Sequence, residues 1–167
     1  MKISIDVHNL SLLYSQNVIE IGSLDGKWSN QLSNSFQKVY CVDFTNLLKP
    51  LLKIKLKIKM GKFYNPKCNE LIGFRSSSLD LIFSMDSLVR CLKIDIKKYL
   101  IEFYRVLRPN GSIYLHLPCN QMPRSVSKGF TSISRSEIFS IRKDIKFDLI
   151  TLKHGIILTA FKSDSNI

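Results

Sequence analysis

A glycine-containing turn between two short apolar runs is the feature of this sequence that most restricts its fold. Residues 17–22 and 38–43 are apolar runs that end in a glycine and an acid, and runs of this length are typical of strands buried on both faces. Between them, Trp28, Leu32 and Phe36 recur every four residues, which places them on one face of a helix over residues 25–36. The chain is therefore predicted to contain a strand–helix–strand unit, which is the building block of parallel sheets.

The middle of the sequence continues the alternation of strand and helix signals. Residues 79–84 form a third apolar run, and residues 112–117 form a fourth after the helix-breaking triplet Pro109-Asn110-Gly111. Between these runs, side chains spaced three and four apart predict one helical face, and Asp95 precedes them as a candidate cap. The members of that face are Ile96, Tyr99, Leu100, Phe103, Val106 and Leu107.

The end of the sequence predicts a helix followed by a hairpin. Ser134-x-x-Glu137 matches a capping box that opens a helix toward Asp144. Residues 146–152 and 156–161 read as two strands joined by a glycine turn. Together these signals predict an α/β fold, a Rossmann-like three-layer sandwich whose mostly parallel sheet has a C-terminal antiparallel hairpin strand. With 167 residues, of which 45% are hydrophobic, we expect a single domain over residues 1–167.

The cysteines and the N-terminus indicate the setting of the protein. No two cysteines form a Cys-x-x-Cys pair, so neither a zinc site nor a disulfide framework is predicted, and no other metal site is expected. Residues 1–16 contain polar side chains, and no apolar run of bilayer length occurs in the sequence. We therefore expect a cytoplasmic protein without a membrane span. The cysteines are Cys41, Cys68, Cys91 and Cys119.

The net charge of +12 raises the question of a polyanionic partner. After a predicted short helix over residues 45–52, residues 53–60 alternate strictly between lysine and apolar side chains, as an amphipathic strand does. A row of lysines could bind nucleic acid or a membrane surface. Lysines also protect the exposed edge of a sheet from pairing with other chains, and we favour this interpretation. Nucleic acid stays a possible partner that the sequence does not favour.

The turn over residues 20–26 has the sequence Glu-Ile-Gly-Ser-Leu-Asp-Gly, and three kinds of ligand site compete for it. A phosphate-binding P-loop needs a longer spacing between its glycines and a hydroxyl residue where Trp28 stands. A dinucleotide site could use Asp43 for the ribose, but Leu24 replaces the glycine that admits a pyrophosphate. The chain is also too short for a separate substrate domain. The third kind of site is one for a sulfonium cofactor, which needs no pyrophosphate gap, and it is the site that the resemblance described next implies.

Three stretches, taken in order, resemble the class I S-adenosylmethionine-dependent methyltransferases, and in particular type 11. These are the turn over residues 20–26, the strand Ser-Leu-Asp-Leu-Ile-Phe-Ser over residues 78–84, and the helix end Tyr-Arg-Val-Leu-Arg-Pro-Asn-Gly over residues 104–111. The resemblance implies S-adenosyl-L-methionine as the cofactor. It implies that the acid and glycines of the turn surround its methionine part, that Asp43 binds its ribose, and that an acid or amide near residue 70 contacts its adenine. The implied cofactor-binding residues are Glu20, Gly22, Gly26, Asp43, Asn69, Glu70 and Ser84.

Two residues near the carboxyl ends of the central strands are candidates for catalysis. Asp86 and His116 could each act as a general base for a hydroxyl-type acceptor. Asp86 could equally cap the next helical turn, and His116 could be a buried core histidine. Residues 83–90 resemble a branch of these enzymes associated with surface sugars, although Arg90 stands where that branch tends to have histidine. We expect a small-molecule or glycan acceptor; the alternatives are an RNA methyltransferase, a basic nucleic-acid-binding module, or an inactive domain of this fold.

Overall fold

The computed structural model describes residues 17–23, 26–43, 71–117, 133–141, 146–152 and 155–163. The predicted helix over residues 45–52, the lysine-rich strand over residues 53–60, and Asn69 and Glu70 lie outside these ranges. In the described part, no helix is long and apolar enough to cross a bilayer.

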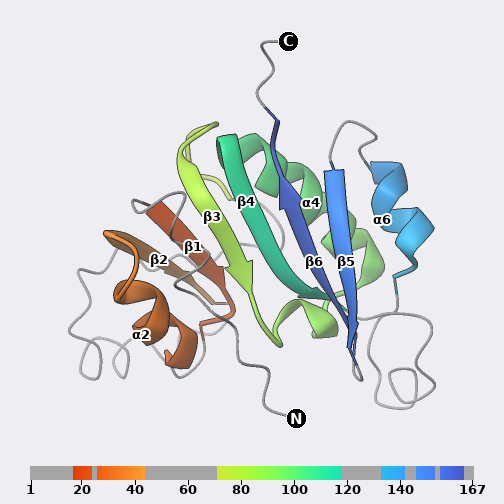
Figure 1. Cartoon of the computed structure of the whole chain (residues 1–167), viewed down its shortest axis with the longest axis horizontal. Helices are drawn as coiled ribbons and strands as arrows, with labels where there is room; N and C mark the ends of the chain where they lie inside the picture. The colour runs from red at the N-terminus through yellow and green to blue at the C-terminus, as the bar shows by residue number, and fades with distance from the viewer. Residues whose placement is uncertain are drawn as a thin grey trace.

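Six strands form one sheet in the order β2-β1-β3-β4-β6-β5 (Figure 1). β1 pairs in parallel with β2 on one side and with β3 on the other, and β3 pairs in parallel with β4. β6 is antiparallel to both of its neighbours, β4 and β5. The predicted mostly parallel sheet with an antiparallel hairpin strand is thus confirmed. The strands are β1 Asn17–Ile21, β2 Lys38–Val42, β3 Leu79–Ser84, β4 Leu107–Leu117, β5 Lys146–Leu152 and β6 Gly155–Phe161.

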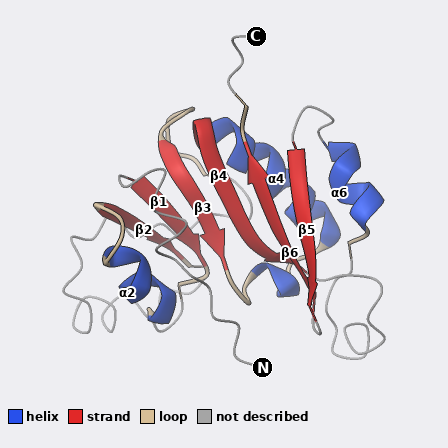
Figure 2. Cartoon of the chain, viewed as in Figure 1, coloured by secondary structure: helices blue, strands red, loops and turns tan. Residues whose placement is uncertain are grey.

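Helices cover both faces of the sheet, which makes the three layers that the sequence predicts (Figure 2). The short helix α2, Lys27–Ser33, lies on one face, and α4, Lys93–Val106, lies on the other together with α6, Arg135–Ile141. Adjacent residues of a strand point to opposite faces. In β1, Val18 therefore packs in the cluster beneath α2, and Ile19 packs in the cluster beneath α4.

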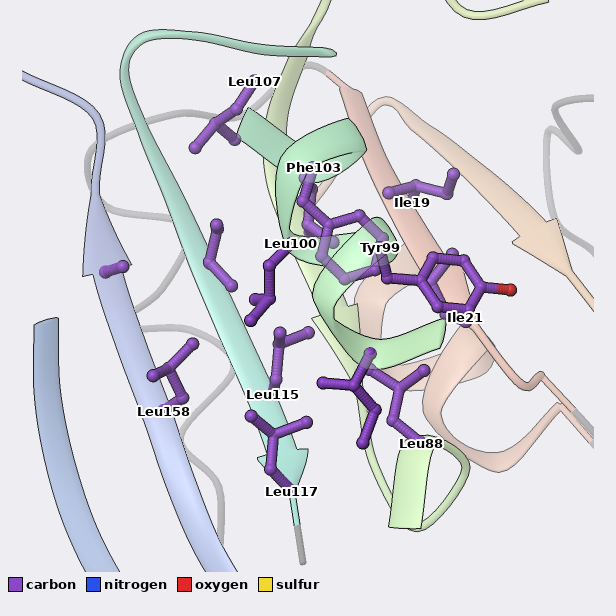
Figure 3. Packing of buried hydrophobic residues seen from close by; sticks show 14 of the residues in the cluster. Ile19, Ile21, Leu88, Tyr99, Leu100, Phe103, Leu107, Leu115, Leu117 and Leu158 are labelled. Atoms are coloured by element: carbon purple, nitrogen blue, oxygen red, sulfur yellow. The ribbon is translucent and has the colours of Figure 1, made fainter. Parts of the chain in front are cut away.

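The larger apolar cluster lies between α4 and the sheet. Figure 3 shows Tyr99, Leu100 and Phe103 of α4 directed toward β1 and β4. The rings of Tyr99 and Phe103 stack with centroids 5.3 Å apart. These residues lie on the face that the spacing of apolar side chains predicts, and all of them are buried. Burial of this face, rather than helix propensity, is the main source of stability for such a helix.

Both ends of α4 differ in detail from the prediction. Asp95 is not the N-cap, which is Leu92; it lies instead in the first turn, where a negative charge suits the helix dipole. The helix ends at Val106, because Leu107 already has extended backbone angles and pairs with Leu79 as the first residue of β4. A proline ring disfavours helical backbone angles in the residue before it, and Arg108, which precedes Pro109, is accordingly part of the strand. The Pro109-Asn110-Gly111 triplet therefore forms an irregularity inside β4, where the register with β3 shifts.

Lys162, which directly follows β6, connects this irregular part of β4 to β6 and to the end of α4 through hydrogen bonds. Its backbone carbonyl accepts a hydrogen bond from the Asn110 amide at 2.7 Å, and its own amide donates to the Gly111 carbonyl at 3.0 Å. The ammonium group donates to the carbonyl of Tyr104 at 3.1 Å and to that of Leu107 at 2.7 Å. A buried lysine thus satisfies carbonyls that the C-terminus of α4 leaves free.

Candidate active site

Four parallel strands end at one edge of the sheet, and the candidate site residues lie along it. Ile21 pairs with Val42, and Ser84 pairs with Leu115, so β1, β2, β3 and β4 finish close together. Their arrowheads point toward the same edge in Figure 1. The chain turns from β1 to β2 on one side, while β3 lies on the other side of β1. Open α/β sheets bind ligands at such a switch point, outside the carboxyl ends of the strands.

The turn after β1 depends on two glycines with positive φ. Gly22 has a φ of 82° and donates its backbone N–H to the Val42 carbonyl at 2.7 Å, which joins the ends of β1 and β2. A Cβ on Gly22 would overlap the side chain of Ser87. Gly26, with a φ of 79°, is the N-cap residue of α2 and donates to the Ser23 carbonyl at 2.7 Å. Glycine is the residue that adopts these angles without strain.

Ser23 is a further candidate site residue, one that the sequence motifs do not identify. Its side chain is only 2% exposed, and its hydroxyl has no hydrogen-bond partner among the parts of the chain that the structure describes. A buried polar group without a partner costs free energy, so a ligand that supplied one would bind favourably here. The two glycines and this hydroxyl fit the polar methionine end of S-adenosylmethionine. The sequence offers only one sign of this role, which is that Ser23 lies within the glycine turn. Serine is common in turns, so this sign does not single it out.

Glu20 is buried on the α2 side of the sheet. Its carboxylate accepts a hydrogen bond from the hydroxyl of Ser29 in α2, and the Cys41 thiol lies 3.4 Å from the same hydroxyl. Burial raises the pKa of the Cys41 thiol to about 12, and the negative charge of Glu20 adds to this effect. Glu20 therefore connects β1 to the first turn of α2, the helix that follows the glycine turn.

The remaining cofactor candidates lie at the ends of the neighbouring strands. Asp43 directly follows β2 and is 7% exposed. Ser84 ends β3, is fully buried and donates its hydroxyl hydrogen to the Ile21 carbonyl at 3.0 Å. Its role in the fold is thus to hold the ends of β1 and β3 together. The predicted adenine contacts, Asn69 and Glu70, lie outside the described residues.

The structure brings the two candidate bases, Asp86 and His116, together. Oδ1 of Asp86 lies 2.7 Å from Nδ1 of His116, although the residues are 30 positions apart. Asp86 follows β3 with a φ of 59°, and His116 is the next-to-last residue of β4. Asp86 is not a helix cap, because Ser87 is the N-cap of the short 3₁₀ helix η2, Leu88–Arg90. His116 is buried as a core histidine would be, and Asp86 is its partner.

Comparisons with known proteins identify the family and the fold. A family model described as a methyltransferase domain matches residues 19–115, which is more than half of the chain. Among solved structures, the N-methyltransferase NodS of Bradyrhizobium japonicum, in complex with S-adenosyl-L-homocysteine, is similar with a TM-score of 0.75 and 12% identity. That match covers 95% of this chain and 84% of NodS.

Two further structures share the fold. A Listeria monocytogenes protein assigned as an S-adenosylmethionine-dependent methyltransferase matches with a TM-score of 0.72 and 10% identity, over 89% of this chain and 91% of that one. A methyltransferase in complex with the activator Trm112 of Haloferax volcanii matches with a TM-score of 0.75 and 14% identity. That match covers 90% of this chain and 83% of the other chain. No curated protein matches the sequence. The chain belongs to the class I S-adenosylmethionine-dependent methyltransferases.

Proposed function

We propose that this enzyme transfers the methyl group of S-adenosylmethionine to a small-molecule or glycan acceptor. The observation that carries the proposal is the pairing of Asp86 with His116 beside the glycine turn, because it places a carboxylate next to the site that fits the methyl donor. The exposure of Asp86 supports an acceptor that arrives from solvent.

We assign the proposed cofactor contacts from the positions of the candidate residues at the carboxyl ends of the strands. Gly22 and Gly26 let the backbone approach the methionine part, and the buried Ser23 hydroxyl gains a partner there. Asp43 is placed to accept hydrogen bonds from the ribose hydroxyls, and Asn69 or Glu70 would contact the adenine. Glu20 and Ser84 support the site by fixing α2 and the ends of β1 and β3. The bound cofactor supplies an activated methyl group, while the protein orients the acceptor toward it.

The proposed acceptor class is argued from the residues of this chain and not from the acceptors of similar proteins. NodS is an N-methyltransferase, and the Haloferax volcanii protein was solved in complex with an activator, but similarities at 12% and 14% identity show a shared fold and not a shared acceptor. The net charge of +12 is the observation that favours the alternative of a nucleic-acid acceptor. Incubation with labelled S-adenosylmethionine and separate glycan, small-molecule and RNA mixtures distinguishes these classes. Label in RNA alone contradicts the proposal.

Calorimetric titration with S-adenosyl-L-homocysteine tests the cofactor site. We expect one site in the wild-type protein and affinity at least about tenfold weaker in Asp43→Ala, which loses charge-assisted hydrogen bonds. Asp148→Asn removes an exposed carboxylate on the edge strand β5 and is the matched control, with unchanged affinity. Absence of binding to the wild-type protein contradicts the proposal.

Ser23→Ala provides a sharper test, because it should change stability and binding in opposite directions. Without ligand, removal of a buried hydroxyl that has no partner among the described residues should raise the free energy of unfolding by up to about 1 kcal/mol. With ligand, the same change should weaken binding because a hydrogen bond is lost. Urea unfolding without ligand and calorimetry with S-adenosyl-L-homocysteine measure the two effects. A variant that is less stable and binds normally would show that Ser23 serves the fold only.

A further inference from the structure

We infer that Asp86 and His116 have different roles in the proposed reaction, and that the acceptor is a hydroxyl compound. Asp86 is the residue that takes the proton from the acceptor, and His116 is a positioning residue that holds the carboxylate. This inference rests on the methyltransferase function proposed above and specifies the chemistry of the same site.

The exposure of the two side chains separates their roles. The Asp86 side chain is 74% exposed, whereas that of His116 is 7% exposed. The Nε2 edge of the imidazole packs against Gly155 at the start of β6, where an added Cβ would lie 2.6 Å from Nε2. An acceptor from solvent can therefore reach the carboxylate, while the imidazole lies beneath it within the sheet. His116 acts on the acceptor only through Asp86.

The backbone around Asp86 holds this carboxylate beside the cofactor turn. On one side of it Met85 is buried, and on the other side Ser87 packs against Gly22 so closely that a Cβ on the glycine would overlap it. Between these anchors, Asp86 has a φ of 59°, a conformation that costs free energy in a residue with a side chain. Strained residues that the surrounding structure fixes in this way cluster at functional sites.

The hydrogen bond to His116 sets the direction of the carboxylate. A carboxylate accepts hydrogen bonds, so in this pair Nδ1 of the imidazole carries the hydrogen and donates it to Oδ1. Among the described residues Oδ2 has no hydrogen-bond partner, so this oxygen is the one that we assign to the acceptor. In many enzymes a histidine is the base and a buried carboxylate orients it. Here the exposed carboxylate is the base and the buried histidine orients it.

A hydroxyl acceptor is the class that needs this arrangement. The acceptor oxygen forms the new O–C bond as the S–C bond of the donor breaks, and the electron pair of the broken bond stays on sulfur. The hydroxyl proton passes to Oδ2 of Asp86, from which it leaves to solvent. A neutral amine attacks through its free electron pair and needs no base beforehand. A carboxylate held at the cofactor turn is therefore useful chiefly for an alcohol or a sugar hydroxyl.

Nuclear magnetic resonance of the ligand-free protein tests the positioning role. Long-range nitrogen–proton spectra distinguish the two neutral imidazole tautomers, and the chain has only three histidines to assign. We expect His116 to carry its hydrogen on Nδ1 in the wild-type protein and to lose this preference in Asp86→Gly, since glycine keeps the positive φ. Asp148→Asn should leave the spectrum of His116 unchanged. A wild-type hydrogen on Nε2, or an unchanged preference in Asp86→Gly, overturns the positioning role.

Methyl transfer to matched probes tests the role of Asp86 and the acceptor class. The probes are monosaccharides and phenols, compared with the corresponding amino sugars and anilines. We expect label only in the hydroxyl probes, and a turnover about a hundredfold lower in Asp86→Asn, with unchanged affinity for S-adenosyl-L-homocysteine. His116→Leu should also lower turnover, and His116→Asn, whose amide can donate to Asp86, should recover part of it.

Each result has a defined consequence. Label in the amine probes, or in no hydroxyl probe, overturns the hydroxyl assignment. Full turnover in Asp86→Asn overturns the proton-transfer role. If His116→Asn folds as the wild type does and is no better than His116→Leu, the positioning role fails. Loss of S-adenosyl-L-homocysteine binding in the wild-type protein would instead contradict the proposed function, so the two failures are distinguishable.

Discussion

At position 22 a side chain is excluded for two independent reasons. The φ of 82° disfavours any residue with a Cβ, and the Ser87 side chain fills the space that the Cβ would need. The first reason lies in the backbone of the turn itself. The second arises from a contact with the segment that follows the neighbouring strand β3. The close approach of Gly22 and Ser87 thus couples the geometry of the glycine turn to that of the segment that contains Asp86.

Gly22→Ala should destabilise the protein by about 2 kcal/mol or more, because strain and overlap add together. In a Ser87→Gly background the overlap disappears, and we expect the penalty to fall to about 1–2 kcal/mol, the cost of the left-handed conformation. Urea unfolding of the four proteins measures both penalties as a double-mutant cycle. Equal penalties in the two backgrounds would show that Ser87 yields without cost.

At the scale of elements, the carboxylate of Glu137 links α6 to α4 in addition to the apolar packing of Ile138. Glu137 accepts hydrogen bonds from the backbone N–H of Ser134 at 2.9 Å and from its hydroxyl at 2.9 Å, and the Glu137 N–H donates back to that hydroxyl. This is the predicted capping box. Glu137 also pairs with Lys93 of α4 at 3.0 Å and lies 3.8 Å from Lys97. The hydrogen bond from the Ser134 amide, and then that from Lys93, lower the pKa of Glu137 to about 2.

This pKa predicts how acid affects the packing of α6. The ordinary pKa of 4.5 applies to the unfolded chain, so above it both states are ionised and the stabilisation is complete. Between 4.5 and about 2 the unfolded chain takes up the proton first, and the stabilisation is lost as the pH falls. Melting temperatures of the wild type and Glu137→Gln should therefore differ most at neutral pH and converge over this range. A constant difference would contradict the lowered pKa.

At the scale of the whole molecule, one sheet separates two apolar clusters. Residues from the two faces alternate along the same strands, so neither cluster can form without the sheet that the other also needs. The only tryptophan, Trp28 of α2, lies on the smaller cluster with its ring 5.5 Å from that of Phe83. Its fluorescence therefore reports the α2 face, while far-ultraviolet circular dichroism reports the secondary structure of the chain.

We expect the two signals to give the same unfolding midpoint in urea, as a single cooperative domain requires. Coincident transitions would support the prediction of one domain over residues 1–167. Trp28→Phe should remove the fluorescence signal and leave one transition in circular dichroism. Two separate midpoints in the wild-type protein would show that the α2 face unfolds independently.

Local patterns are sufficient to predict the layers and the glycine turn after β1. Apolar runs, four-residue spacing and a glycine at the end of the first strand are properties of neighbouring residues, and they identify β1, α2 and β2 from the sequence alone. The capping box at Ser134 is equally local, and its prediction is confirmed. The ends of α4 are harder to predict, because Asp95 and the Pro109-Asn110-Gly111 triplet have several local interpretations.

Contacts between distant residues are decided only by the tertiary structure. The sequence presents Asp86 and His116 as two separate candidates, and the parallel pairing of β3 with β4 places them 2.7 Å apart. The hydroxyl of Ser23 is without a partner in the described part of the chain only because the surrounding strands and helix bury it. The irregular start of β4 likewise depends on the register with β3. A sequence pattern specifies which face a side chain occupies, but register and burial are set by the whole sheet, and these determine which groups meet at the site.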